Sequence, residues 1–356
     1  MQDGHNIIVP RPVIPDNNLF QADENTRYGY IVNKILSGHK VSIKGSYSSA
    51  LSVYSKLKKQ IGKKFPVNSY SSSRIYRHEL SNAAARLLVE VKNGEVSLER
   101  FPQIGWLREF YAGMESFYLS FPDVLGLNGA WQWYLKGVSY SMLDHRIHPF
   151  YGVYFPTRTN HLVMFDRWLR ENARNYKAAI DVGTGSGVLS FIMLKHGIKN
   201  ILSTDINPNS IYGLKKELKR LGFGSRIRAE KTNLFETPPA HPLLVVFNPP
   251  WIPGNPENEI DRGIYFHPSL FRDFFDRAFE KLGKDSVIAI FFSNFFSLAG
   301  LQTEHPLEKE LKENNRFRLA EKKEMKASRP SKRNKNKWLH ELRKKEKTEL
   351  WILKRI

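Results

Sequence analysis

The chain has 356 residues, of which 41% are hydrophobic and 25% charged, so it is long and apolar enough for one large or two ordinary domains. Its 55 Lys and Arg against 35 Asp and Glu give a net charge of +20, which makes a polyanionic partner worth considering beside a basic surface that serves only solubility. The absence of cysteine excludes disulfides and any Cys-ligated zinc site, and no other metal site is expected.

Neither the first residues nor the most apolar late run carries a targeting or membrane signal. Residues 1–13, "MQDGHNIIVPRPV", lack the basic start and the apolar stretch of a signal peptide. Residues 287–300, "VIAIFFSNFFSLAG", are too few to span a bilayer. We therefore expect a cytoplasmic protein without a membrane partner, while its oligomeric state stays open.

Residues 1–133 are expected to form a mostly helical N-terminal domain that recognises the substrate. Apolar side chains at helical spacing predict a helix over 49–65, and 77–94 is interpreted as a second helix that ends at an Asn-Gly pair. The aromatic-rich stretch 101–138 is interpreted as a continuation of this helical region. The first helix carries a basic patch made of Lys56, Lys58, Lys59, Lys63 and Lys64.

Residues 134–160 are expected to form a linking hairpin and 161–356 an α/β catalytic domain, because strands alternate with helices from about residue 178 onward. Such alternation predicts a parallel sheet covered on both faces. The predicted strands are 178–182, 201–206, 226–232, 243–247 and 286–292, followed by a final hairpin of 316–325 and 348–356. The predicted helices are 187–196, 208–221, 269–282 and 306–314.

A glycine-rich loop links the first of these strands to its helix in "AIDVGTGSGVLSF", residues 179–191. Glycines permit a tight turn and let a ligand approach the backbone, where the helix N-terminus offers free N–H groups. Asp205 ends the next strand and can accept both hydroxyls of a ribose. The glycines follow a GxGxG spacing rather than the GxGxxG of nicotinamide enzymes. Asp181 lies just before them, and an acid there suits a ligand with a cationic amino-acid end better than a pyrophosphate.

On these motifs, residues 150–356 resemble the class I S-adenosylmethionine-dependent methyltransferases. The resemblance implies an α/β fold with a Rossmann-like seven-stranded methyltransferase sheet, and S-adenosyl-L-methionine as the cofactor. In that family an acid after the third strand often contacts the adenine amino group, whereas this chain has Asn233 there. The residues that the resemblance assigns to the cofactor are Phe155, Arg158, Asp181, Gly183, Thr184, Gly185, Gly187, Asp205, Ile206, Asn233 and Asn248.

The strand 243–247 runs into Asn248, Pro249, Pro250 and Trp251, and "NPPW" resembles the Asn-Pro-Pro-aromatic motif of methyltransferases that act on planar nitrogens. Proline stops the sheet ladder and stiffens the loop. The Asn248 side-chain oxygen and the Pro249 carbonyl can accept both hydrogens of an amino or amide nitrogen, and the indole can stack on a flat acceptor. These four residues are the predicted catalytic residues.

Residues 134–165 resemble the hairpin that precedes the catalytic domain of release-factor glutamine methyltransferases. The counterpart of that family's proline-arginine pair is "FPTRTNH", which implies that Phe155, Pro156 and Arg158 lie over the cofactor. The chain departs from that pattern at Asn160 and His161, where the family has an acid. After the NPPW motif, Asp261 and His267 are candidates for the rim of the site.

A basic insertion, residues 322–347, separates the two strands of the final hairpin. It contains twelve Lys or Arg and three Glu, a net +9. Lys-rich tracts are usually flexible, and this one can bind phosphates or remain a solvated loop.

Together these features predict an S-adenosylmethionine-dependent N-methyltransferase whose favoured acceptor is an exocyclic amino group of a base in RNA or in a ribonucleoprotein. Two alternatives stay open: a protein glutamine N-methyltransferase acting on a ribosome-associated protein, and a non-catalytic nucleic-acid-binding module with a methyltransferase fold. A nicotinamide oxidoreductase is disfavoured by the glycine spacing and by NPPW.

Overall fold

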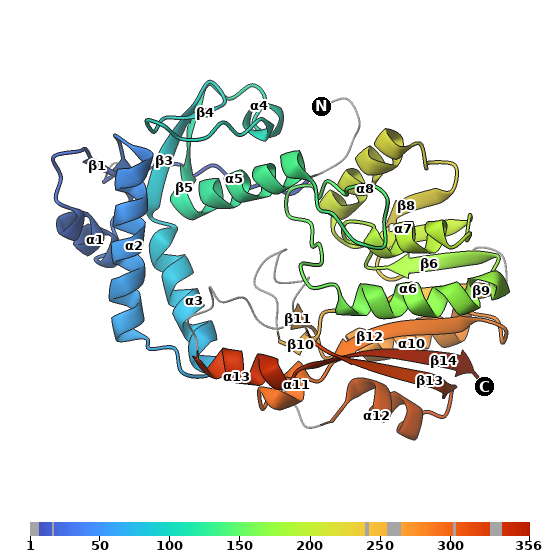
Figure 1. Cartoon of the computed structure of the whole chain (residues 1–356). Coiled ribbons are helices and arrows are strands. Elements are labelled where there is room, and N and C mark those ends of the chain that lie inside the picture. The colour runs from blue at the N-terminus through green and yellow to red at the C-terminus, as the bar shows by residue number, and fades with distance from the viewer. Residues whose placement is uncertain (1–6, 16–17, 239–241, 255–264, 302–303, 328–336) are drawn as a thin grey trace. The chain divides into compact units, whose positions relative to one another are not determined.

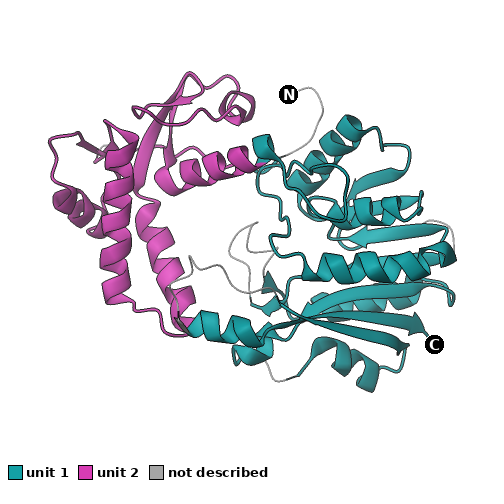
Figure 2. Cartoon of the chain, viewed as in Figure 1, with its two compact units in different colours: residues 1–8, 134–356 teal, residues 9–133 magenta. Residues whose placement is uncertain are grey.

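The computed structural model describes residues 7–15, 18–238, 242–254, 265–301, 304–327 and 337–356 (Figure 1). The chain divides into two compact units (Figure 2): unit 1 comprises residues 1–8 and 134–356, and unit 2 comprises residues 9–133. No helix within the described ranges is both long enough and apolar enough to cross a membrane.

Unit 1 is built around a seven-stranded sheet in the order β13-β14-β12-β9-β6-β7-β8. Its strands are β6 (Ala178–Val182), β7 (Ile201–Asp205), β8 (Ile227–Lys231), β9 (Leu243–Phe247), β12 (Val287–Ser293), β13 (Phe317–Lys326) and β14 (Lys347–Arg355). Strands β8, β7, β6, β9 and β12 pair in parallel, and β14 lies antiparallel between β12 and β13. This arrangement confirms the predicted Rossmann-like methyltransferase sheet with its final hairpin.

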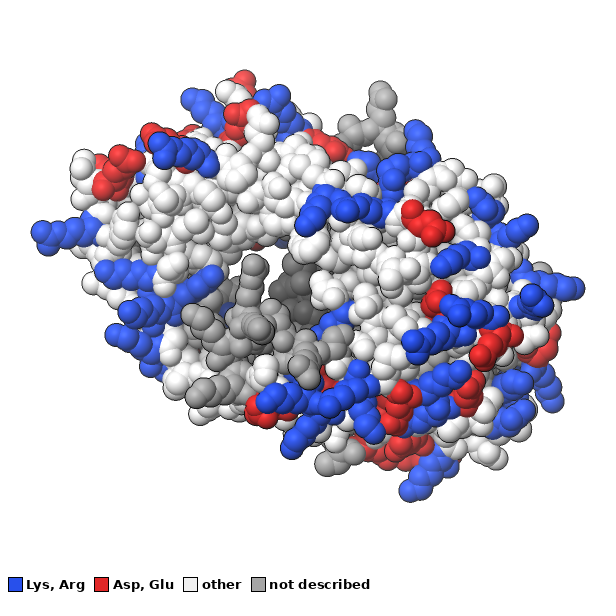
Figure 3. All heavy atoms as spheres, in the orientation of Figure 1, with Lys and Arg blue, Asp and Glu red and all other residues white. Residues whose placement is uncertain are grey.

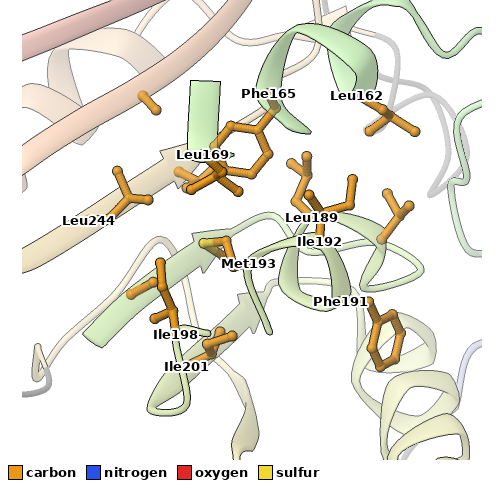
Figure 4. Close-up of a cluster of buried hydrophobic side chains, with 14 of the residues drawn as sticks. Leu162, Phe165, Leu169, Leu189, Phe191, Ile192, Met193, Ile198, Ile201 and Leu244 are labelled. Carbon is orange, nitrogen blue, oxygen red and sulfur yellow. The ribbon is translucent and has the colours of Figure 1, made fainter. Parts of the chain in front are cut away.

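Helices cover both faces of the sheet: α6 (Asn160–Asn172), α7 (Val188–Lys195), α8 (Pro208–Leu221), α10 (Leu270–Lys281), α11 (Phe295–Leu298), α12 (Pro306–Glu313) and α13 (Lys337–Lys345). Alternate residues of β9 point to opposite faces of the sheet, because side chains in a strand alternate in direction. Leu244 and Val246 join a core with residues of α6, α7 and α8, part of which Figure 4 shows. Leu243 and Val245 join a second core with residues of α10 and α12.

The order of the strands places the candidate site. The chain moves outward from β6 to β7 and β8 on one side, then crosses to β9 and β12 on the other. At such a switch point the loops leaving the carboxyl ends of neighbouring parallel strands diverge and leave room for a ligand. The glycine loop after β6, Asp205 at the end of β7 and Asn248 after β9 all lie at this edge.

Unit 2 contains helices, as expected, and also a five-stranded sheet that the sequence pattern did not predict. Its strands are β1 (Phe20–Ala22), β2 (Val41–Ile43), β3 (Leu87–Lys92), β4 (Glu95–Val96) and β5 (Ser116–Ser120). Its helices are α1 (Tyr28–Leu36), α2 (Tyr47–Lys64), α3 (Tyr70–Ala84), α4 (Trp106–Phe110) and α5 (Phe121–Lys136), the last of which runs into unit 1.

The helix predicted over 77–94 is wrong in its second half. Helix α3 ends at Ala84, and the apolar run after it forms β3, whose residues pair with β2, β4 and β5. The closing Asn93-Gly94 pair has φ values of 52° and 74°, which make it the tight turn of the β3–β4 hairpin rather than a helix end. Burial of Val89 and Val91 in the sheet outweighs the helical signal of the alanines before them.

Residues 134–160 contain one antiparallel bridge, Val138–Ile147, in place of two paired strands. Further along this segment two backbone carbonyls accept hydrogen bonds from side chains at the start of α8. The carbonyl of Gly152 accepts from Asn207 Nδ2 at 2.9 Å, and the carbonyl of Tyr151 accepts from Asn209 Nδ2 at 2.9 Å. The segment is thus held against the start of α8 without forming a ladder.

The second core gives a test of the fold. Phe274 is fully buried and packs against Phe235 and Phe247, so Phe274→Ala should lower the free energy of unfolding by about 3–5 kcal/mol. The matched change on the same helix, Phe279→Ala, removes a ring that is 38% exposed and should cost about 1 kcal/mol. Urea unfolding of both variants measures the difference, and equal losses would contradict this packing.

Candidate active site

The glycine loop adopts a backbone that other residues rarely reach. Gly183, Gly185 and Gly187 have φ values of 65°, 52° and 81°. A Cβ on Gly185 would lie 2.8 Å from the Tyr154 carbonyl oxygen, and one on Gly187 would lie 2.5 Å from Leu214 Cδ1. The loop therefore needs glycine at these two positions for conformation and for space.

Hydrogen bonds tie this loop to its neighbours. The N–H of Gly185 donates to Asp205 Oδ2 at 2.9 Å, and the N–H of Thr184 donates to the Thr204 carbonyl at 2.9 Å. Across the loop, the N–H of Ser186 donates to the Tyr154 carbonyl at 3.1 Å. The loop is thus fixed between the end of β7 and the segment that contains Phe155 and Arg158.

Asp181 lies fully buried beneath the loop. Its Oδ2 accepts from Thr184 Oγ1 at 2.8 Å, from Ser190 N at 3.1 Å and from Ser190 Oγ at 2.6 Å. Its Oδ1 has no hydrogen-bond partner in the described structure. Burial raises the pKa of Asp181 to about 6, and the hydrogen bonds to Ser190 and Thr184 oppose that rise.

The residues expected near the ribose and adenine lie together after β7 and β8. Asp205 Oδ1 accepts from the Asn207 N–H at 2.9 Å, and burial raises the pKa of the Asp205 carboxyl. The next side chain, Ile206, is 47% exposed. The Thr232 N–H donates to the Asp205 carbonyl at 3.1 Å, which brings the exposed Asn233 to the same edge.

The NPPW segment leaves β9 at the same edge of the sheet. Pro249 is buried, and the stretch beyond Trp251 forms β10 (Ile252–Pro253), which pairs with β11 (Tyr265–Phe266). Asn248 Oδ1 and Trp251 Nε1 are buried and have no partner in the described structure. His267 is exposed and bonds to Ser269, whereas Asp261 lies outside the described residues.

His161 is a buried neighbour of Trp251 that the sequence analysis noted only as a departure from a motif. Its ring lies edge-to-face with Trp251 at 5.7 Å and with Phe291 at 5.7 Å. Burial lowers the pKa of His161 to about 4, so the ring is neutral at physiological pH. The His161 ring thus supports one edge of the indole and carries no charge into the site.

Arg158 is held in place by an ion cluster whose members are far apart in the sequence. Its Nη1 donates to Glu346 Oε2 at 2.7 Å, and Arg343 Nη1 donates to both oxygens of the same carboxylate at 2.7 Å. Glu346 is fully buried and also accepts from Ser293 Oγ, at the end of β12, at 3.1 Å. The contact expected between Arg158 and a cofactor therefore stays a prediction, because at least one of its N–H groups is engaged here.

The basic insertion is more ordered in its second part than its composition indicates. Part of it forms α13, and Arg343 packs over the Phe295 ring at 4.1 Å, so this part is not a solvated loop. Several other described cations of the tract also lie in ion pairs with acids. These pairs are Lys322 with Glu324 and Glu349, Lys323 with Glu321, Lys344 with Glu341, and Lys347 with Glu324.

Two family models match the chain. The model described as ribosomal protein L11 methyltransferase (PrmA) matches residues 38–235, and the one described as methyltransferase small domain matches residues 165–318. A provisionally named protein N5-glutamine methyltransferase of Methanocaldococcus jannaschii is 32% identical over 90 residues, which are 25% of this chain. The match spans 45% of that relative's length.

Among solved structures, a provisionally named RNA methyltransferase from Pyrococcus horikoshii is 14% identical and covers 62% of this chain and 90% of its own, with a TM-score of 0.39. A geranyl diphosphate methyltransferase in complex with S-adenosylmethionine is 11% identical and covers 54% of this chain and 84% of its own, with a TM-score of 0.41. Both scores lie below 0.5, so neither structure bears on the acceptor of this chain.

The sheet, the glycine loop and the family models define a class I S-adenosylmethionine-dependent methyltransferase. Because the first model spans more than half of its residues, the chain belongs to the ribosomal protein L11 methyltransferase (PrmA) family. The cofactor of such an enzyme is S-adenosylmethionine.

The residues at this edge of the sheet fit that cofactor. Asp181 Oδ1 and Ser186 Oγ are buried without a partner in the described structure, so the loop offers two unsatisfied side-chain polar atoms. An ionised carboxylate suits the ammonium group at the methionine end. Asp205 and the exposed Ile206 suit a ribose hydroxyl and the adenine face, respectively.

The raised pKa of Asp181 predicts how cofactor affinity depends on pH. As the pH falls through about 6, the free protein protonates Asp181 and loses the charge that attracts the ligand's ammonium group. The dissociation constant should therefore increase, by up to about tenfold per pH unit below that value. Calorimetry of S-adenosylmethionine binding from pH 8 to pH 5 measures this increase.

Two controls accompany this titration. Asp181→Asn should bind more weakly at pH 8 and should flatten the profile. The ligand 5′-methylthioadenosine lacks the amino-acid end and should show little pH dependence with the unmodified chain. A wild-type affinity for S-adenosylmethionine that stays constant over this range would contradict the role of Asp181.

The Arg158–Glu346–Arg343 cluster predicts that substitution of Glu346 destabilises the protein much more than substitution of Glu341 on the neighbouring helix α13. Glu346→Gln leaves two guanidinium groups facing each other, and should lower the free energy of unfolding by about 2–3 kcal/mol. Part of each guanidinium reaches water, which keeps the effect below that of a fully buried pair. The exposed partner of Lys344, changed by Glu341→Gln, should leave the melts almost unchanged, because water screens this ion pair.

Proposed function

We propose that this chain methylates a planar nitrogen that Asn248 holds at the carboxyl end of β9. The observation that carries the proposal is the buried Asn248 Oδ1, which has no partner in the described structure. A buried acceptor is costly to leave unpaired, so a donor from a ligand is the natural partner. The same edge of the sheet carries the glycine loop and Asp205.

The chemistry of a planar nitrogen explains why such an acceptor is useful. Its lone pair is shared with a π system, so it attacks poorly unless it is oriented. Asn248 Oδ1 and the Pro249 carbonyl would accept its two hydrogens and direct the lone pair. S-adenosylmethionine supplies an electrophilic methyl group when bound. Trp251, supported by His161, would hold the flat acceptor against its ring.

For the acceptor, we propose an exocyclic amino group of a base in RNA or in a ribonucleoprotein. The net charge of +20 supports a polyanion. The described part of the basic insertion adds less to that support than its composition indicates, because many of its cations pair with glutamates.

A protein glutamine is the second candidate, and a specific comparison favours it. The Methanocaldococcus relative is provisionally named as a glutamine methyltransferase, and the family model is named for a ribosomal protein. The first name supports a planar amide nitrogen as the acceptor, and the second supports a protein acceptor in place of RNA.

A transfer assay decides between these candidates. Tritiated S-adenosylmethionine and the purified chain are incubated with total RNA, DNA and total protein, and the labelled product is digested with ribonuclease or protease. We expect label that ribonuclease releases. Protease-sensitive label would support the glutamine candidate, and cofactor binding without any label would support a non-catalytic binding module.

Asn248→Ala should reduce the rate of methyl transfer by about 10²–10³ while the affinity for S-adenosylmethionine changes little. The reason is that this side chain is proposed to contact the acceptor nitrogen, in place of the cofactor contact that the resemblance implies for Asn248. Asn248→Asp keeps an oxygen acceptor and should retain more of the rate than the alanine variant. Near-normal turnover by Asn248→Ala on the true substrate would show that NPPW only shapes the loop.

A further inference from the structure

Half of the net charge of the chain lies in one stretch of unit 2. Residues 28–86 contain eleven Lys or Arg and one acid, Glu79, for a net +10 out of +20. The cations are Lys34, Lys40, Lys44, Lys56, Lys58, Lys59, Lys63, Lys64, Arg74, Arg77 and Arg86. The stretch includes α1, α2 and α3.

Helix α2 arranges three of these cations on one face. Its eighteen residues include no acid, and its buried side is formed by Ala50, Val53, Leu57 and Ile61. Lys56, Lys59 and Lys63 follow at spacings of three and four residues, so they share an exposed face over about 10 Å of helix. In the described structure none of the three makes an ion pair.

Such a face is unfavourable in the isolated molecule. Like charges three and four residues apart on a helix lie on the same face and repel each other. A helix that needs only solubility can mix the two signs, as α12 does with its glutamates and lysines. A phosphate backbone would turn this repulsion into attraction.

Helix α1, against which Lys56 rests, carries two exposed tyrosines. The Lys56 Nζ lies 3.2 Å from the point where a Cβ of Gly29 would be, so it rests against α1 at the residue that separates Tyr28 from Tyr30 in the sequence. These tyrosines are 38% and 51% exposed, and the Lys34 Nζ lies 5.6 Å from the centre of the Tyr30 ring. Exposed rings next to a row of cations are what single-stranded nucleic acids bind, through stacking and phosphate contacts.

We propose that this surface of unit 2 docks the single-stranded backbone of an RNA substrate. The α1–α2 surface is defined by Tyr28, Tyr30, Lys34, Lys56, Lys59 and Lys63. Figure 3 shows Lys and Arg side chains gathered along the edge of unit 2 where α2 lies. The proposal rests on the proposed function only in taking RNA as the substrate. It assigns the main non-specific affinity to α2 and not to the basic insertion.

The test is binding of a fluorescein-labelled, mixed-sequence 20-nucleotide single-stranded RNA by the full chain, without cofactor, from 50 to 300 mM NaCl. The triple variant Lys56→Gln, Lys59→Gln, Lys63→Gln removes three phosphate contacts. At 150 mM salt its affinity should fall by about 10–100-fold, and the slope of log K against log salt should fall by about 2. Its melting temperature should not decrease, because repulsion within α2 is relieved.

A matched control separates this surface from net charge. Lys199→Gln, Lys215→Gln, Lys219→Gln removes three exposed lysines of unit 1 and should change RNA affinity less than about threefold. Tyr30→Leu should weaken binding about tenfold without altering the salt slope, since it removes stacking and leaves the charges.

Two results would overturn the proposal: unchanged affinity and salt slope in the α2 variant, or an equal loss in the control variant. Unchanged RNA binding with slower methylation of a ribosomal protein would assign the surface to a protein partner instead. Because no turnover is measured in the binding assay, its result is independent of whether Asn248 directs methylation of a nitrogen.

Discussion

The structure of the catalytic unit depends on the turn between β6 and α7. Three glycines with positive φ let the chain reverse within a few residues, and two of them lie too close to Tyr154 and Leu214 for any side chain. Because the turn is held to Asp205 by the Gly185 N–H, the ends of β6 and β7 form one polar edge. The segment after β9 then brings Asn248 to that edge, where a cofactor and an acceptor can meet.

Much of this could be predicted from the sequence, because the signals are local. The strands and helices that were predicted between β6 and β14 lie within one residue of their expected ends, whereas α11 and α13 were not predicted. The glycine loop, Asp205 and NPPW each consist of neighbouring residues whose chemistry needs a particular turn. The error over 77–94 has the same origin: the alanines of α3 are a local helical signal, whereas β3 forms only because β2 and β5 lie beside it.

Contacts between distant residues were beyond local reasoning. Glu346 meets Arg158 across 188 positions, and His161 supports Trp251 across ninety, so neither could be found by spacing. The basic insertion shows the same limit. Its composition indicates a flexible tract, yet Arg343 is fixed by a buried carboxylate, so the free cations of the molecule are better sought on α2.

The most direct test of planar-nitrogen methylation is the chemical identity of the methylated atom. The labelled product from total RNA and protein is digested to nucleosides and amino acids, and the position of the methyl group is found by tandem mass spectrometry. We predict a methyl group on an exocyclic amino or amide nitrogen, such as that of adenine, guanine or glutamine. A methyl group on a ribose oxygen, a ring carbon or a carboxylate would contradict the role given to Asn248.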